Sequence, residues 1–188
     1  MTPEAETERL MLKPIALADA EQIQAIFPRW EIVQYLNTRV PWPYPADGTR
    51  RFIKQVALPS VERGDAWNWT LRLKSEPERI IGNLELRKSE TDHRGFWLCP
   101  EWQRQGLMSE ACAWANDFWF NTLGFAVLRV SKAAENRRSR RISARHGMRL
   151  VGVTEKDFVC GRLPSETWEI TAEEWRAWKA KTSAQPVR

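Results

Sequence analysis

The sequence predicts an α/β (α+β) domain in which helices pack on both faces of a mixed, mostly antiparallel sheet of about seven strands. Three observations lead to this fold class. Apolar and polar residues alternate in three consecutive segments between residues 67 and 101, which is the period of antiparallel strands. A long segment of helical period follows at 106–124. Further strand-like and helix-like segments precede and follow this unit, so strands and helices are interleaved along the chain.

Length and composition fit one globular domain. The chain has 188 residues, of which 43% are hydrophobic and 28% charged, close to average globular usage. This balance argues against a disordered chain or a coiled coil. No window approaches 18 uninterrupted apolar residues, and the first ten residues are acidic where a secretory signal would be basic and then apolar. We therefore expect a cytoplasmic protein without a membrane segment.

The net charge and the cysteines indicate which ligands and which covalent links to expect. A formal net charge of +5 favours an anionic partner. The three cysteines, Cys99, Cys112 and Cys160, are dispersed and lack the spacing of a zinc site, so neither a disulfide nor a metal is expected. The 11 tryptophans should lie in the core or in a pocket wall, although aromatic residues beside basic ones also stack nucleic-acid bases.

The N-terminal third predicts a strand, a helix, a loop and a second helix. Residues 8–18 have the pattern of a half-buried strand, and a helix follows from a cap at Asp19 to Pro28, which ends it. Three prolines and a glycine make 39–48 a loop, after which helical period resumes at 49–58. The loop holds Trp42 and Tyr44. These aromatic side chains form either the wall of a substrate pocket or a hydrophobic cover for the core.

The remaining elements follow from residue 67 onward. Segments 67–74, 79–88 and 94–101 predict an antiparallel meander of three strands. A core helix over 106–124 ends at Gly124, and its buried stripe is predicted to be Leu107, Ala111, Trp114 or Ala115, Phe118 and Trp119. A strand over 126–134, a short helix over 137–147 and strands over 149–158 and 166–175 complete the domain, the last turning helical. The tail 179–188 is expected to be frayed.

The stretch 99–111 carries the clearest chemical signal. A strand ends there, a polar turn with one glycine follows, and a long helix begins. The first amides of a helix lack intrahelical acceptors and carry the positive end of the helix dipole, so this turn suits an anion such as a pyrophosphate. Gly106 lets the backbone approach the anion, and Gln103, Arg104 and Gln105 add donors without a competing carboxylate. Many helices begin with a glycine and bind nothing, which is the alternative interpretation.

Several motifs in order resemble the GNAT superfamily of N-acetyltransferases, over about residues 8–178. The family's phosphate loop, Q/R-x-x-G-x-G/A, is matched at Gln103 and Gly106 but departs at Met108. G-L-M-S-E-A is similar to the branch that contains the Rim-type ribosomal-protein N-terminal acetyltransferases, as are W-P-Y at 42–44, I-I-G at 80–82 and G-F-W-L at 95–98. The segments A-E-N-R-R-S at 134–139 and R-H-G-M at 145–148 resemble the family's second motif.

This resemblance implies a single acyl-CoA N-acyltransferase domain over residues 1–188, with acetyl-CoA in a V between two parallel strands that splay apart. The acetyl group would pass to a primary amine, either a protein N-terminus or a small molecule, by direct attack in a ternary complex. The protein would act as a monomer or homodimer. The implied cofactor contacts are Leu98 for the pantetheine, the loop for the pyrophosphate and Asn136 for the cofactor arm, the loop being Gln103, Arg104, Gln105, Gly106, Leu107, Met108 and Ser109.

The acid that protonates the departing thiolate is where the sequence departs most from the family. Many members place a tyrosine seven residues after the asparagine, and here that position is Ser143. Ser139 and Ser143 are candidates for assisting the thiolate, although a serine hydroxyl is a poor acid. The alternative is that either serine belongs to a polar helix face.

For the base, Glu85 lies mid-strand and points to the face opposite Leu84 and Leu86. The alternative is an ion pair with Arg87, two residues along on the same face; His93 and Glu101 are weaker candidates. Deprotonating a lysine near pKa 10.4 at pH 7 costs roughly 4 to 5 kcal/mol, whereas an N-terminal amine near 8 costs about 1 to 1.5. A site without an obvious strong base therefore leans toward an α-amine acceptor.

The run 137–149 holds six arginines and no acidic residue, and it has three interpretations. It forms a solvated helix face, a clamp for the cofactor's 3′-phosphate, or a surface that contacts RNA or the ribosome. The last interpretation, without catalysis, would make the protein a nucleic-acid-binding or ribosome-binding module, which is the alternative to the enzyme.

Overall fold

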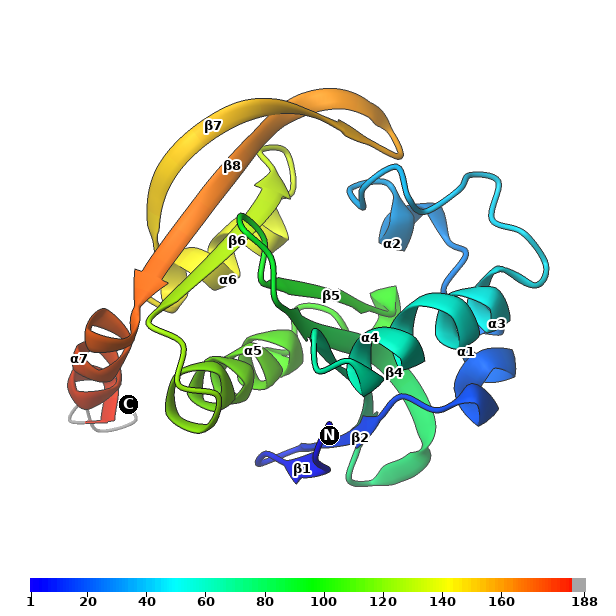
Figure 1. Ribbon diagram of the computed structural model, residues 1–188, viewed down its shortest axis with the longest axis horizontal. Coiled ribbons are helices and arrows are strands. Elements are labelled where there is room, and N and C mark those ends of the chain that lie inside the picture. Colours follow the sequence, from blue (N-terminus) through cyan, green and yellow to red (C-terminus); the bar gives the residue numbers. More distant parts are fainter. Residues whose placement is uncertain (184–188) are drawn as a thin grey trace.

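Two antiparallel sheets form the frame of the protein in this computed structural model, which describes residues 1–183 (Figure 1). The first sheet has the order β1-β2-β3-β4-β5, with bounds Ala5–Glu6, Leu10–Pro14, Ala66–Leu73, Glu76–Arg87 and Arg94–Leu98. The second has the order β6-β8-β7, with bounds Val127–Ala133, Gly161–Thr171 and Arg149–Phe158. The described residues thus contain eight strands against the seven predicted, and the additional one is the two-residue β1.

The predicted meander is confirmed as β3, β4 and β5, and β3 is the central strand of the five-stranded sheet. The register pairs Trp69 with Leu84 in β4 and with Pro14 in β2. Both faces of β3 are buried, because Trp67, Trp69 and Leu71 belong to the main hydrophobic core and the polar residues between them are also covered. A strand covered on both faces needs helices on both sides of the sheet.

Helices indeed cover both faces of the first sheet. One face carries the N-terminal helices, whose apolar side chains share a cluster with Ile80. They are α1, α2, α3 and α4, with bounds Ala20–Ile26, Trp30–Val33, Gly48–Phe52 and Leu58–Glu62, the last two joined by a wide turn at Ile53–Ala57. The other face carries α5, Leu107–Asp117, which continues as a wide turn to Thr122. Figure 1 shows these two helical layers with the sheet between them.

Asp19 occupies the predicted N-cap position of α1, but its side chain does not accept a hydrogen bond from the helix amides. Its side chain accepts hydrogen bonds from the Ala16 N–H at 2.8 Å and from Arg72 at 2.7 Å, one turn before the helix. Arg72 is buried in β3, so the carboxylate of Asp19 satisfies a buried guanidinium in preference to the helix amides. The prediction of the α5 stripe holds better, since Leu107, Ala111, Ala115, Phe118 and Trp119 are buried.

The first sheet ends at β5, where the neighbouring β6 splays away. The His93 N–H donates to the Arg129 carbonyl at 2.8 Å, and the Arg129 N–H donates to His93 Nδ1 at 2.9 Å, so the two strands touch near their beginnings. No register pairs β5 with β6 within residues 1–183, and every strand pair there is antiparallel. The two strands begin together and then splay apart, which agrees with the V that the resemblance implied, although no ladder of hydrogen bonds pairs them within residues 1–183.

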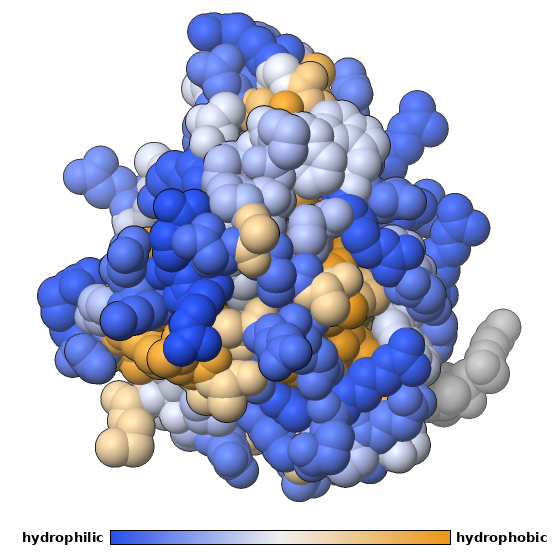
Figure 2. Space-filling view, turned by 90° about the vertical axis from the view of Figure 1, so that its right-hand side faces the viewer, coloured by the Kyte–Doolittle hydropathy of each residue, from blue (hydrophilic) through white to orange (hydrophobic). Residues whose placement is uncertain are grey.

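The C-terminal part consists of β6, α6 at Arg137–Arg145, the curved β7–β8 hairpin and α7 at Ala172–Ser183 (Figure 1). The prediction of a frayed tail from residue 179 was wrong for its first residues, because α7 continues to Ser183 and Lys179 pairs with Asp117 at 2.6 Å. Residues 184–188 lie outside the described residues. Viewed from the side of α1–α3, the surface is mostly hydrophilic with hydrophobic residues in limited patches (Figure 2).

Candidate functional site

A cleft of about 730 Å³ lies where β5 and β6 splay apart. One wall comes from the end of β5, residues 96–98, and the other from α6 along its length. The start of α5 forms the floor at Gly106–Ser109, and residues 31–36 of the α2 region close the far side. The cleft therefore lies at the carboxyl ends of both strands, which is the usual place for a ligand in sheets that part between neighbouring strands.

The loop before α5 has the geometry expected of an anion site. Gly106 has φ +82° and Arg104 has φ +65°, both in the left-handed region. Within residues 1–183, no acceptor takes a hydrogen bond from the backbone N–H groups of residues 104–109. A Cβ added to Gly106 would meet Arg9 Nη2 at 3.3 Å. The free amides and the dipole of α5 favour an anion at this end of the cleft.

Two glutamines of the loop serve mainly to hold it in place. Gln103 Nε2 donates to the Leu98 carbonyl at 2.8 Å, and its Oε1 accepts from Arg138 Nη1, so it joins the end of β5 to α6. Gln105 Nε2 donates to the Glu101 carbonyl at 3.1 Å, and Gln105 is not among the residues that line the cleft. The other loop residues that the sequence predicted to contact the cofactor all line the cleft, namely Arg104, Gly106, Leu107, Met108 and Ser109.

Most of the arginine-rich run faces the cleft. Arg137, Arg138, Arg141 and Arg145 line it, whereas Arg140 pairs with Glu166 at 2.8 Å. Arg149, the sixth, pairs with Glu169 and Glu174. Asn136 also lines the cleft, and its Oδ1 caps α6 by accepting from the Ser139 N–H at 3.1 Å. This distribution places a strong positive charge beside the loop.

The two candidate serines occupy different environments. Ser139 lines the cleft at 9% exposure. Ser143 is fully buried, is absent from the lining, and its Oγ accepts from Lys132 Nζ. Burial and the nearby Arg94 lower the pKa of Lys132 to about 7. Ser143 therefore lies outside the cleft, where it accepts a hydrogen bond from a buried lysine.

The three predicted bases are engaged elsewhere. Glu85 accepts from Arg87 at 2.6 Å, which confirms the ion pair proposed as the alternative, and it lies outside the cleft lining. His93 holds β5 to β6 and stacks on Trp119 at 4.8 Å, and burial lowers its pKa. Glu101 pairs with Arg29 at 2.6 Å, and this hydrogen bond lowers the pKa of the Glu101 carboxyl.

The aromatic residues of the proline-rich loop also lie outside the lining. Tyr44 packs edge-on against Phe27 at 5.0 Å and belongs to the cluster under the N-terminal helices. Burial raises the pKa of its phenol. Trp42 is 43% exposed and packs on Trp30 at 5.7 Å. Tyr44 thus covers the core, whereas Trp42 forms an exposed aromatic pair beside the α2 wall.

No pattern in the sequence indicated the residues that close the cleft. Glu31 and Tyr35 come from the α2 region, and Glu135 comes from the turn before α6. Glu31 and Glu135 are the only carboxylates lining the cleft within the described part of the chain, and the hydroxyls lining it are those of Tyr35, Ser109 and Ser139. The sequence held only a weak signal for Tyr35. The resemblance leads one to expect a tyrosine where the chain has Ser143, and the chain has only two tyrosines, both elsewhere.

Within residues 1–183, every helix is too short or too polar to cross a membrane. The model of the acetyltransferase (GNAT) domain matches residues 9–149 of the chain. An uncharacterized N-acetyltransferase of Bacillus subtilis (strain 168), YoaA, is 26% identical over 175 residues, which are 89% of this chain and 94% of YoaA.

Solved structures extend the likeness to the whole fold. RimJ of Mycobacterium smegmatis, solved in complex with CoA-disulfide, superposes with a TM-score of 0.81 at 17% identity, over 98% of this chain and 97% of RimJ. The ribosomal-protein-S5-alanine acetyltransferase of Vibrio fischeri gives a TM-score of 0.76 at 18% identity, over 92% of this chain and 98% of that chain. At these identities the structural likeness supports the fold, and the family match is the stronger result.

Proposed function

Because the chain belongs to the GNAT family of acetyltransferases and is therefore an acetyl-CoA-dependent enzyme, we propose that the cleft between β5 and α6 transfers the acetyl group to the α-amine of an acceptor. The observation that carries this proposal is the row of free amides at residues 104–109 beside the cleft arginines. These groups match the diphosphate and the 3′-phosphate of coenzyme A in charge and in hydrogen-bonding capacity.

The residues present fit the cofactor. The loop amides and Gly106 would hold the pyrophosphate, Arg138, Arg141 and Arg145 would hold the 3′-phosphate, and residues 96–98 would border the pantetheine. The bound acetyl-CoA supplies an acetyl thioester that an amine can attack directly. The protein has to orient the two substrates, take up the proton that the incoming ammonium loses before it attacks, and stabilise the departing thiolate.

Glu31 is the residue we propose for attracting the acceptor. Its exposed carboxylate lines the wall opposite α6, beside the aromatic pair of Trp30 and Trp42. Glu135, the other carboxylate, lies in the turn directly before α6, whose arginines are proposed to bind the cofactor. An ammonium near Glu31 and an apolar side chain near the tryptophans would suit the first residues of a peptide.

Two hydroxyls are proposed to assist the thiolate, Tyr35 and Ser139, which line the cleft. The phenol of Tyr35 is the more acidic of the two hydroxyls, so it is the better hydrogen-bond donor to the developing thiolate. A serine hydroxyl is a far weaker acid, so Ser139 would orient rather than protonate. Tyr35 would thus supply the phenol that the position of Ser143 lacks.

The α-amine is favoured over a lysine side chain for an energetic reason. At pH 7 an α-amine near pKa 8 costs about 1 to 1.5 kcal/mol to deprotonate, against roughly 4 to 5 for lysine. Glu85, His93 and Glu101 are engaged in structural contacts, so the described cleft offers only Glu31 and Glu135 as carboxylate bases. A weak base is sufficient for an α-amine.

The test is an acceptor comparison that follows release of free thiol. Short peptides with a free N-terminus are compared at pH 7 with the same peptides acetylated at the N-terminus and carrying one lysine. We expect kcat/KM to be at least tenfold higher for the free N-terminus. Equal or higher kcat/KM for the lysine peptides would contradict the α-amine assignment while leaving the acetyltransferase activity intact.

The alternative of a non-catalytic RNA-binding module has less support. Four of the six arginines in the run face the cleft and two are ion-paired, so they do not form one outer basic surface. Contact with the ribosome is compatible with an N-terminal peptide acceptor, and it would be detected as salt-dependent binding that persists when coenzyme A fills the cleft.

A further inference from the structure

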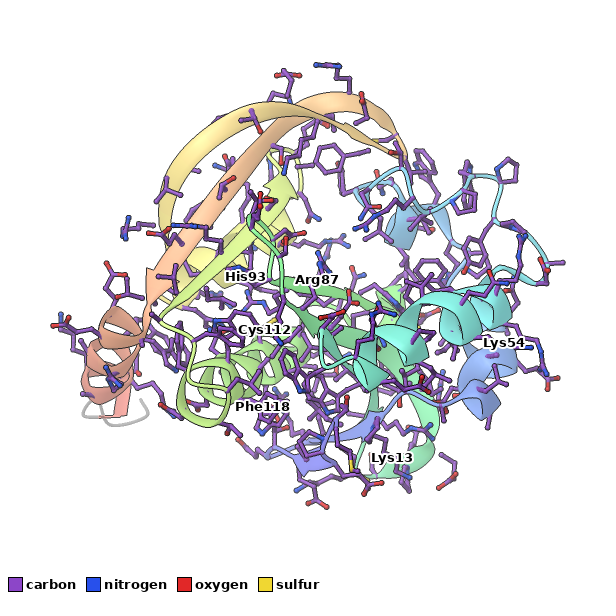
Figure 3. All side chains as sticks on the ribbon, in the orientation of Figure 1. Lys13, Lys54, Arg87, His93, Cys112 and Phe118 are labelled. Carbon is purple, nitrogen blue, oxygen red and sulfur yellow. The ribbon has the colours of Figure 1, made fainter. Side chains whose placement is uncertain are left out.

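A second group of polar side chains lies beneath the cleft, between α5, the start of β5, β6 and α6. Arg94, Asn116, Lys132 and His146 are only 4%, 0%, 6% and 3% exposed. Cys112 and Asn116 are one turn apart on the same face of α5. Figure 3 labels Cys112 beside this helix. The group is thus enclosed by protein on the inner side of the catalytic cleft.

These side chains carry an excess of hydrogen-bond donors. Arg94 Nη1 donates to Asn116 Oδ1, but Arg94 Nε, Arg94 Nη2 and Asn116 Nδ2 have no partner within residues 1–183. The ring Nδ1 of His146 also has none, while its Nε2 lies 3.0 Å from Ser109 Oγ. If the Ser109 hydroxyl donates to Nε2, then Nδ1 carries the proton and becomes a further donor.

The group also carries uncompensated positive charge. No carboxylate lies within 4.0 Å of Arg94 or Lys132 in the described part of the chain. The nearest carboxylates that act on Lys132, those of Asp92 and Glu166, are already paired with Arg87 and Arg140. Because a guanidinium does not lose its proton, burying Arg94 without a counter-charge is strongly unfavourable.

We propose that this cluster binds a small monovalent anion of the chloride class, held by Arg94 Nε and Nη2, with Asn116, Lys132 and His146 around it. A water molecule would satisfy fewer of the donors, because its oxygen has two lone pairs and no charge. The thiol of Cys112 is not an effective counter-charge, because burial raises its pKa. An anion satisfies the donors and the charge together.

Thermal unfolding tests the proposal with coenzyme A saturating the cleft, so that the cleft arginines are occupied. At constant ionic strength, sodium chloride replaces sodium gluconate in steps. Above the dissociation constant, each tenfold increase in chloride should raise the Tm by about 3 to 5 °C. A Tm that does not depend on the anion would overturn the proposal.

Asn116→Asp provides a variant that should fold, because it places a fixed carboxylate beside Arg94. We expect this variant to lose the chloride dependence of Tm, since the new carboxylate replaces the anion. Arg162→Gln, at an exposed arginine near Asp157, is the matched control and should keep the full dependence. Full chloride dependence in Asn116→Asp, or its loss in Arg162→Gln, would contradict a buried site at Arg94.

Crystals grown in sodium bromide locate the ion directly. An anomalous peak within hydrogen-bond distance of Arg94 Nε or Nη2 is the expected result. Anomalous peaks confined to surface arginines or to the cleft, with only water density at Arg94, would refute the site.

Discussion

Ser109 and His146 join the floor of the cleft to the buried end of α6: Ser109 Oγ lies 3.0 Å from His146 Nε2. His146 packs edge-on against Trp175 and Trp178 of α7, at 5.8 and 5.5 Å. The C-terminal helix therefore supports the first turn of α5 through one histidine, although these residues are distant in sequence.

His146→Ala should weaken acetyl-CoA binding without touching the cofactor. Loss of the ring frees the Ser109 hydroxyl and leaves space beneath the first turn of α5, so we expect the Kd for acetyl-CoA to rise roughly 3- to 10-fold. Calorimetric titration measures it. Ser109→Ala gives the comparison: the double variant should be no weaker than His146→Ala alone, and additive losses would show that the two residues act independently.

Lys132 should make the stability of the protein depend on pH. Its pKa is about 7 in the folded state, against about 10.4 when unfolded. Between these values the unfolded state binds the additional proton, so the free energy of unfolding should rise from pH 7 toward pH 10. Urea unfolding in gluconate buffers measures this slope. In Lys132→Met it should be smaller, and an unchanged slope would assign the effect to other groups.

Tyr35 should act on the chemical step. Tyr35→Phe removes the phenol that we propose to stabilise the thiolate, so kcat should fall about 10- to 100-fold with little change in the KM for acetyl-CoA. Steady-state kinetics with a peptide acceptor test this. Tyr44→Phe is the matched control, because Tyr44 lies in the core cluster outside the cleft, and it should leave kcat unchanged.

The elements were largely predictable because their signals are local. Gly106 and Asn136 are the N-cap residues of α5 and α6. A helix start can be predicted from the few residues on either side of its N-cap. Tyr35 and Glu31 were not found, because the four-residue α2 is too short to show a helical period and its place over the cleft depends on long-range packing. The burial of Ser143 against Lys132 is likewise a tertiary contact between α6 and β6 that no local pattern records.

Arg104 and Arg141 should contribute to cofactor affinity as separate charges. Each alanine substitution should raise the KM for acetyl-CoA roughly 3- to 10-fold, and more at low salt, because each removes one charge-assisted donor. Steady-state kinetics at two salt concentrations measure it. Arg162→Ala is the control, since Arg162 is exposed on the β8 strand and should leave KM unchanged. Equal effects at all three positions would mean that only net charge matters.

The free amides at the start of α5 are proposed to bind the pyrophosphate of acetyl-CoA, and substitution of Gly106 is the sharpest test of this role. Both Gly106 and Gly124 have left-handed φ angles, +82° and +74°, so a side chain strains the backbone equally at each, but only Gly106 lines the cleft. Gly106→Val and Gly124→Val should therefore lose similar stability.

Calorimetric titration of both folded variants with acetyl-CoA decides the matter. We predict that Gly106→Val raises the Kd at least tenfold, because the β-branched side chain blocks approach to the amides, while Gly124→Val binds as the unmodified protein does. Unchanged affinity in Gly106→Val would contradict the account, because the loop would then not be the pyrophosphate site.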